Sequence, residues 1–342
     1  MTQNKRELVE AALHNKPVDR VPVGFWFHFL EDQRNTDAVS DPALEEQNLA
    51  GHRNFIESWH PDFVKIMTDG FFQYPNPAVT RPIQSIQEAA DVRPLGRDSA
   101  WFTSQVAFAK KLSSAYGKEI KLFYNLFAPA RTLNFVQEKV GGQSDLAVFL
   151  REDPATLKKV LDVIAEDYAA LAEALIRDGG VDGIYLSVNN INKDTVAAVD
   201  YQAYIAPSEI TVLAGANRAN PENILHICGY EGFLNHLEWY KEYPFLAVNW
   251  AAHLEGVSLA EGKKLFDGRA VIGGFGQTEK DVIYVGTKAE IEQETERLLK
   301  EAGTVGVILG ADCTVPRDID VQRFNWVRDK AAAVKYENGL PD

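Results

Sequence analysis

Eight short apolar segments recur along this chain, and longer stretches with helical patterning separate them. The segments span residues 21–30, 63–69, 120–127, 183–189, 223–230, 245–250, 270–275 and 306–310. Apolar strands that alternate with helices form parallel βα units, because each helix returns the chain to the same end of the sheet. Eight such units close into a barrel, so the sequence predicts an α/β fold, a (β/α)8 TIM barrel.

Helix-start signals between the segments support this interpretation. Asp41-Pro42 and Asp153-Pro154 each place a capping aspartate before a proline at the first helical position. An open doubly wound sheet is the alternative, but no G-x-G-x-x-G follows the first apolar segment. No linker rich in Pro, Gly or Ser divides the chain, which predicts one barrel domain over residues 1–342, with an N-terminal helix and lead-in over residues 1–20.

Composition excludes several classes of protein. A hydrophobic content of 46% with 25% charged residues is ordinary for a soluble enzyme, and no run approaches the roughly 18 apolar residues of a membrane span. The net charge of −14 argues against a nucleic-acid partner, since phosphates require a basic surface. The N-terminus lacks an apolar signal core, and two cysteines form no disulfide framework, so we expect a cytoplasmic location.

The segment 223–230 contains the most informative residues. Side chains alternate along a strand, so His226 and Cys228 point the same way, and an imidazole beside a thiol suits a soft divalent metal. The other cysteine, Cys313, lies where segment 306–310 passes into a loop. One histidine and two cysteines make a three-ligand zinc site with an open fourth position, which is the catalytic pattern. All three fall at C-terminal strand ends, where barrels carry their active sites.

A simpler explanation exists for each of these residues alone. A lone cysteine in a cytoplasmic enzyme is most often a small buried hydrophobe, and a lone histidine a satisfied polar residue. The metal is favoured because the chain places both cysteines at strand ends and one of them in an H-x-C pair. The two segments are not neighbours in a barrel, so the loop after Gly310 would have to reach across the mouth.

The ligand charges suggest which chemistry such a metal would support. Zinc lowers the pKa of a bound thiol or water by stabilising the anion. Two thiolates and a neutral histidine leave a Zn²⁺ site formally neutral, which disfavours activation of water but keeps a bound thiolate nucleophilic. We therefore favour thiol alkylation over hydrolysis, although the ligand types alone also permit hydrolytic or dehydrogenase chemistry.

Further polar residues lie close to expected strand ends. His253 and Glu255 are candidate catalytic residues that could supply a fourth ligand or orient His226, and a solvated loop explains them equally well. Candidate substrate-binding residues at or near strand ends are Asn125, Ser187, Asn189 and Asn249.

Several motifs resemble the uroporphyrinogen decarboxylase superfamily. They are Asp19-Arg20-Val21-Pro22-Val23, the H-x-C-G segment at His226, Ile272-Gly273-Gly274-Phe275-Gly276 with Gly286-Thr287, and the loop from Gly310 to Pro316. The similarity extends over nearly the whole chain and implies a (β/α)8 barrel, with two branches of chemistry.

The decarboxylase branch uses no metal. Its members carry an arginine-rich R-Q-A-G-R-Y segment that binds the carboxylates of a tetrapyrrole, whereas the matching stretch here, 24–32, has no arginine before Arg34. Asp69 does match the active-site aspartate of the decarboxylases, so the resemblance implies a catalytic role for it.

The second branch comprises corrinoid-dependent methyltransferases similar to methylcobamide:coenzyme M methyltransferases. His226, Cys228 and Cys313 match its zinc motif residue by residue. The resemblance implies one Zn²⁺ per chain, a small-molecule thiol activated by it, and a methylcorrinoid donor carried by a partner corrinoid protein. Barrels of this kind often form a homodimer.

Three hypotheses follow from the sequence. The first is a zinc-dependent methyltransferase, the second a metal-free tetrapyrrole decarboxylase that relies on Asp69, and the third a non-catalytic corrinoid- or tetrapyrrole-binding barrel. The identity of the thiol stays open.

Overall fold

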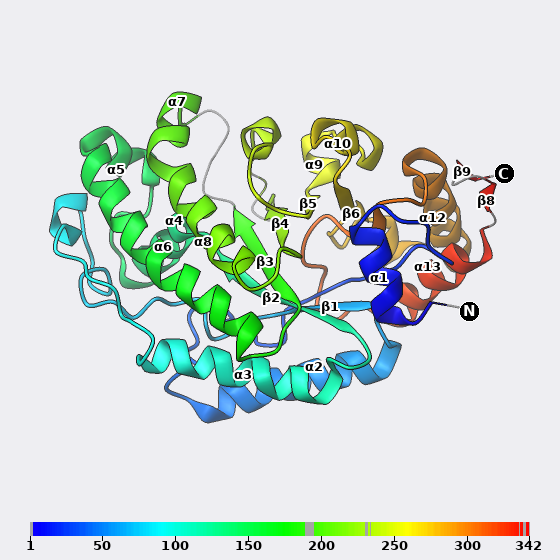
Figure 1. Ribbon diagram of the computed structural model, residues 1–342, viewed down its shortest axis with the longest axis horizontal. Helices are drawn as coiled ribbons and strands as arrows, with labels where there is room; N and C mark the ends of the chain where they lie inside the picture. Colours follow the sequence, from blue (N-terminus) through cyan, green and yellow to red (C-terminus); the bar gives the residue numbers. More distant parts are fainter. Residues whose placement is uncertain are drawn as a thin grey trace.

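The computed structural model describes residues 3–188, 195–229, 232 and 234–334, and the backbone of 336–337 and 340–341. Its centre is one curled sheet of seven parallel strands that pair in sequence order (Figure 1). The strands are β1 (Phe63–Ile66), β2 (Lys121–Phe127), β3 (Gly183–Val188), β4 (Ile224–Ile227), β5 (Ala247–Trp250), β6 (Ala270–Phe275) and β7 (Val307–Ala311). A separate antiparallel pair joins β8 (Tyr336–Glu337) to β9 (Leu340–Pro341).

Helices surround the sheet, as Figure 1 shows. The longer ones are α1 (Lys5–Leu13), α2 (Pro42–Trp59), α3 (Ala100–Tyr116), α4 (Pro129–Val140), α6 (Pro154–Arg177), α8 (Ala206–Asn217), α12 (Lys288–Ala302) and α13 (Gln322–Ala333). Shorter ones are α5 (Leu146–Glu152), α7 (Ala198–Asp200), α9 (Ala252–Glu255), α10 (Leu259–Leu265), α11 (Val282–Val285), the 3₁₀ turns η1 (Ile86–Ala89) and η3 (Leu237–Tyr240), and the π-turn η2 (Tyr201–Ile205).

The aspartate–proline signals begin helices as the sequence predicts. Asp41 accepts a hydrogen bond from the Ala43 N–H at the start of α2, and Asp153 accepts from Ala155 at the start of α6. In both helices the following proline occupies the first turn, where its missing N–H has no cost.

The first of the eight expected strands, residues 21–30, differs from the prediction. It makes a single parallel bridge, between Val23 and Leu309, so the described residues contain seven strands in this sheet and the count of eight is not confirmed. The Gly24 N–H donates to Leu309 O (2.9 Å), and the Asp62 N–H donates to Val23 O (3.3 Å). The segment therefore lies between β7 and β1. It pairs with β7 only around Val23, and Pro22 before it has no N–H to donate to a ladder.

Two apolar clusters fill the fold. The larger one lies between the sheet and the outer helices. The smaller one joins side chains such as Phe63, Phe123 and Tyr185 on the strands to Val9 and Leu13 of α1. The first helix thus packs against apolar side chains of the curled sheet, and the fold is TIM-barrel-like.

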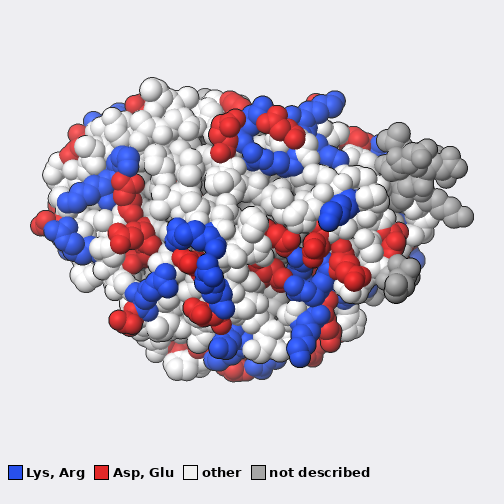
Figure 2. Space-filling model, viewed as in Figure 1, with Lys and Arg blue, Asp and Glu red and all other residues white. Residues whose placement is uncertain are grey.

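The described residues include no helix long and apolar enough to cross a membrane. On the face drawn in Figure 2, acidic and basic side chains are interspersed and do not gather into one basic patch.

Candidate metal centre

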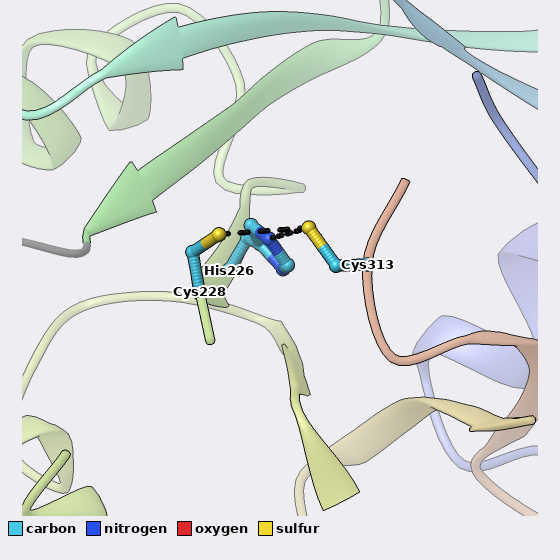
Figure 3. A group of neighbouring side chains, drawn as sticks. All are labelled: His226, Cys228 and Cys313. Carbon is cyan, nitrogen blue, oxygen red and sulfur yellow. Dashed lines mark hydrogen bonds between the residues drawn. The ribbon is translucent and has the colours of Figure 1, made fainter. Parts of the chain in front are cut away.

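The structure brings the H-x-C pair and the second cysteine together. His226 lies on β4, Cys228 follows that strand, and Cys313 lies two residues beyond β7. Cys313 Sγ is 3.5 Å from Cys228 Sγ and 3.3 Å from His226 Nε2. The three ligand atoms all lie within 4.8 Å of one another, and all three residues are buried. Figure 3 shows the side chains converging from two separate parts of the chain. The loop after β7 therefore brings Cys313 to His226 and Cys228, although β7 and β4 are not neighbours.

Backbone hydrogen bonds hold both cysteine loops in place. The Cys228 N–H donates to Val188 O (2.9 Å), which extends the pairing of β4 with β3. The Asp312 N–H donates to Phe275 O (2.8 Å) at the end of β6, and the Val315 N–H donates to Trp26 O (3.1 Å). Each sulfur is therefore positioned by neighbouring strands.

These distances fit a tetrahedral zinc. With Zn–S of about 2.3 Å and Zn–N of about 2.05 Å, tetrahedral geometry separates two sulfurs by about 3.8 Å, and a sulfur from a nitrogen by about 3.6 Å. The observed 3.5 and 3.3 Å are within about 0.3 Å of those values. Thiol and imidazole donors select zinc over the oxygen-seeking magnesium and calcium.

Asn249 on β5 fixes the orientation of His226. Its Nδ2 donates to Ile272 O (2.8 Å) and Ala311 O (3.2 Å), so its Oδ1 faces His226 Nδ1 and accepts a hydrogen bond. The proton therefore sits on Nδ1, and the Nε2 lone pair points toward Cys313. Burial lowers the pKa of His226, which also favours the neutral, ligating form. The sequence predicts that Asn249 binds substrate and that His253 or Glu255 orients His226. In the structure, Asn249 makes the hydrogen bond that orients His226.

Lys65 of β1 is a site residue that the sequence reasoning missed. It is 5% exposed, and its ammonium lies 4.5 Å from the ring centre of Tyr185 and 4.9 Å from that of Trp26. Burial lowers its pKa to about 8, against the opposing effect of Cys313 and Cys228. The sequence does contain a sign of this role. Lys65 lies inside an apolar strand, on the same side as Phe63, and a lysine is rarely buried without a reason.

The two cysteines affect one another. The contact with Cys228, together with burial, raises the pKa of the Cys313 thiol, and the nearby Lys65 opposes that change. Two buried sulfurs in contact resist ionisation unless a cation lies beside them. A divalent ion between them would remove that penalty.

A small chamber at the candidate metal centre shares part of its lining with a wide cleft. The chamber, of about 40 Å³, contains the three candidate ligands together with Lys65, Asn125 and Ser187. The cleft, of about 620 Å³, is lined by the loops that follow β6 and β7. His28 and Thr314 line both spaces.

The other predicted site residues have distinct positions. Asn125 and Ser187 line the chamber, and Asn125 Oδ1 has no hydrogen-bond partner in the described part of the chain. Asn189 lies outside the described residues. The buried Asp69 accepts hydrogen bonds from His28 Nδ1 (2.6 Å) and from the N–H groups of Phe29 (2.6 Å) and Leu30 (3.1 Å).

His253 and Glu255 support the two cysteine loops. His253 Nδ1 lies 2.9 Å from Oδ2 of Asp312, the residue before Cys313, and this contact raises the pKa of His253. Glu255 Oε1 accepts from the Asn235 N–H (2.7 Å), and Asn235 Nδ2 donates to Cys228 O (3.3 Å). Neither residue lines the chamber.

Comparisons with known proteins agree with this fold. A family model described as uroporphyrinogen decarboxylase (URO-D) matches residues 71–333. A "methyltransferase from Methanosarcina mazei" is similar in structure, with a TM-score of 0.70 and 15% identity over 96% of this chain and 98% of that one. No curated protein matches the chain.

Two further enzymes are also similar in structure. A B12-independent methionine synthase from Shewanella sp. W3-18-1 has a TM-score of 0.55 and 13% identity, over 84% of this chain and 86% of that one. A beta-mannanase from the blue mussel Mytilus edulis has a TM-score of 0.52 and 11% identity, over 94% and 93%. At such identities the likeness shows the fold alone.

Proposed function

The chain belongs to the uroporphyrinogen decarboxylase family, and from that premise we propose that it is a zinc-dependent methyltransferase. It would move a methyl group from a methylated corrinoid, carried by a partner protein, to a small-molecule thiol. His226, Cys228 and Cys313 would hold one zinc per chain. The observation that carries the proposal is the buried meeting of these three ligand atoms within 4.8 Å, from strands that are not neighbours.

The donor set and its surroundings suit thiol chemistry. When bound, zinc would favour the anionic form of an acceptor thiol. Asn249 holds His226 neutral and aimed at the sulfurs, and Lys65 adds a positive charge to the lining of the chamber. Asn125 and Ser187 offer polar atoms in that chamber for the acceptor. A reducing cytoplasm would keep both cysteines available to the metal.

The exposed apolar side chains support docking of a partner at the same end. In the described ranges, the exposed large apolar residues lie in the connections that follow β3, β4, β5 and β6, three of them on the short helices α7, α9 and α11, and they are Val199, Leu234, Leu254 and Val285. These connections begin at the C-terminal ends of their strands, which is the end that carries the candidate ligands. Apolar side chains exposed there would suit a corrinoid protein that delivers its methyl group. The similar methyltransferase from Methanosarcina mazei is consistent with this proposal.

Family membership also favours a second candidate, a metal-free tetrapyrrole decarboxylase that uses Asp69. The contacts of Asp69 weaken this candidate, since three hydrogen bonds from the chain occupy its carboxylate. A non-catalytic binding barrel is the third hypothesis, and turnover separates it from the first.

Metal content tests the proposal most directly. We expect elemental analysis of the purified, untagged protein to find about one zinc per chain. Cys313→Ala should lose most of that zinc, whereas His14→Ala, a histidine paired with Glu222 before β4, should keep it. The zinc-loaded protein should then demethylate free methylcobalamin when a thiol is added. No zinc uptake under reducing conditions, with turnover of a porphyrinogen, would establish the decarboxylase instead.

A further inference from the structure

A histidine that is not among the candidate ligands lies beside the metal centre. His28 belongs to the segment between β7 and β1, and its Nδ1 is 2.6 Å from Asp69 Oδ1. Its ring contacts the edge of the Phe72 ring, with the centres 6.0 Å apart. The side chain is 17% exposed, so one part of the imidazole is covered and another is open.

The surroundings of Asp69 determine which nitrogen of His28 carries the proton. Asp69 Oδ2 accepts from the N–H groups of Phe29 and Leu30, and the Asp69 backbone oxygen accepts from Asn48 Nδ2 (3.0 Å). Because these donors hold the carboxylate as an acceptor, His28 donates through Nδ1. Nε2 then carries a lone pair, and it has no hydrogen-bond partner among the described residues.

This imidazole sits where the cleft meets the chamber. His28 lines the cleft of about 620 Å³ and also the chamber that contains Cys228, Cys313 and His226. A small molecule that enters from the cleft toward the three ligands passes this side chain. Few other groups in the chamber lining can accept a proton, since arginine does not deprotonate and Lys65, with a pKa of about 8, already carries its proton at neutral pH.

We propose that His28 is the proton acceptor for the substrate thiol and that Asp69 is its positioning residue. This inference rests on the proposed methyltransferase function. The S–H bond breaks, its electron pair stays on sulfur, and the proton moves to Nε2 of His28. The sulfur then forms a bond to the methyl carbon, the carbon–cobalt bond of the donor breaks, and cobalt keeps both electrons. The proton leaves His28 through the cleft, so the thiol and methylcorrinoid yield a thioether, reduced corrinoid and one proton.

Asp69 is the charged group that contacts His28, and Lys65 lines the same chamber. The remaining charged side chains that line the cleft and the chamber are Glu31, Glu279, Lys280, Arg317, Arg34 and Arg131.

Proton counting on thiol binding tests the inference separately from turnover. The zinc-loaded protein is titrated with 2-mercaptoethanol at pH 7 by calorimetry in two buffers of different ionisation heat. In the wild type the thiol proton stays on His28, so the number of protons released to the buffer should be close to zero. His28→Gln should release about one proton and bind about tenfold more weakly, and this difference should shrink at about pH 9, where the thiol ionises unaided. His14→Gln should behave like the wild type.

The outcomes separate the two claims. If the wild type binds 2-mercaptoethanol but releases about one proton, as His28→Gln does, the role of His28 is refuted and the methyltransferase proposal stands. If the zinc-loaded wild type does not bind the thiol, the methyltransferase proposal falls, and the inference falls with it.

A measurement on the wild type keeps the inference testable if His28→Gln does not fold. In ¹⁵N spectra of the seven histidines, adding the thiol should protonate one further imidazole at Nε2. No change in any imidazole would refute the role of His28.

Discussion

The clearest quantitative prediction concerns Asn249, which joins the candidate metal centre to the sheet. Replacement by leucine keeps the approximate volume but removes both ends of the amide. His226 loses the acceptor that fixes its tautomer, and Ile272 O and Ala311 O lose a donor. The imidazole can then rotate or move its proton to Nε2, and either change removes the ligand lone pair.

The magnitude follows from comparable metal sites. Loss of a group that orients a ligating histidine typically weakens metal binding by about 10- to 100-fold, which corresponds to about 1.4–2.7 kcal/mol. The upper end is expected here, because His226 is 1% exposed and few other groups can replace the acceptor. Loss of the amide donor should also destabilise the metal-free protein, by about 1–3 kcal/mol for any carbonyl left buried without another partner.

Competition with a chromophoric chelator at neutral pH measures the zinc affinity. Asn125→Leu is the matched control, since Asn125 is also a buried asparagine of the chamber, and among the described residues its side chain makes a single, long hydrogen bond of 3.4 Å, to Thr68. We expect Asn125→Leu to bind zinc like the wild type. If Asn249→Leu binds zinc within about twofold of the wild type, the account of His226 orientation is wrong, because it requires about tenfold or more.

Three further predictions concern stability. Burial raises the pKa of Glu209 from 4.5 to about 7. The contribution of this side chain to the free energy of unfolding is therefore fully present below about pH 4.5 and is lost as the pH rises through about 7. Urea unfolding should therefore find Glu209→Gln close to the wild type at pH 4.5 and more stable by about 3 kcal/mol well above pH 7, whereas an equal difference at both pH values would contradict the assignment. Gly24→Ala should cost about 1–3 kcal/mol in the same assay, because the added Cβ would lie 2.1 Å from the Phe63 ring; no loss would show that the segment can move. Removal of zinc by a chelator should lower the unfolding free energy by about 2.7 kcal/mol when compared with free zinc at about 100 times its Kd, and a Cys313→Ala variant should show no such change.

Much of the sheet was predictable from the sequence because parallel strands buried on both faces are nearly continuous apolar runs. Segments 63–69 and 270–275 illustrate this, and they correspond to β1 and β6. The meeting of His226, Cys228 and Cys313 was also predictable, since barrel chemistry lies at C-terminal strand ends and rare residue types stand out there. Residues 21–30 were predicted to form a strand because their apolar pattern resembles one, whereas Val23 alone forms a bridge to the sheet.

The supporting contacts were beyond the sequence because they depend on register between strands. Asn249 is paired in register with His226 on one side and Ile272 on the other, and only this alignment brings its amide to the histidine and to Ile272 O. His28 and Asp69 are 41 residues apart and meet because the segment between β7 and β1 curves over the end of β1. Neither contact produces a local pattern in the sequence, because each joins residues that are far apart along the chain.

The irregular segment between β7 and β1 links the metal centre to the histidine–aspartate pair. A regular strand would commit its N–H and C=O groups to its two neighbours over its full length. Here the pairing stops after Gly24, so Trp26 O is available to accept from Val315, two residues beyond Cys313. The N–H groups of Phe29 and Leu30 are likewise available to Asp69. The same departure from strand geometry therefore anchors the Cys313 loop and holds His28 in the lining of the chamber.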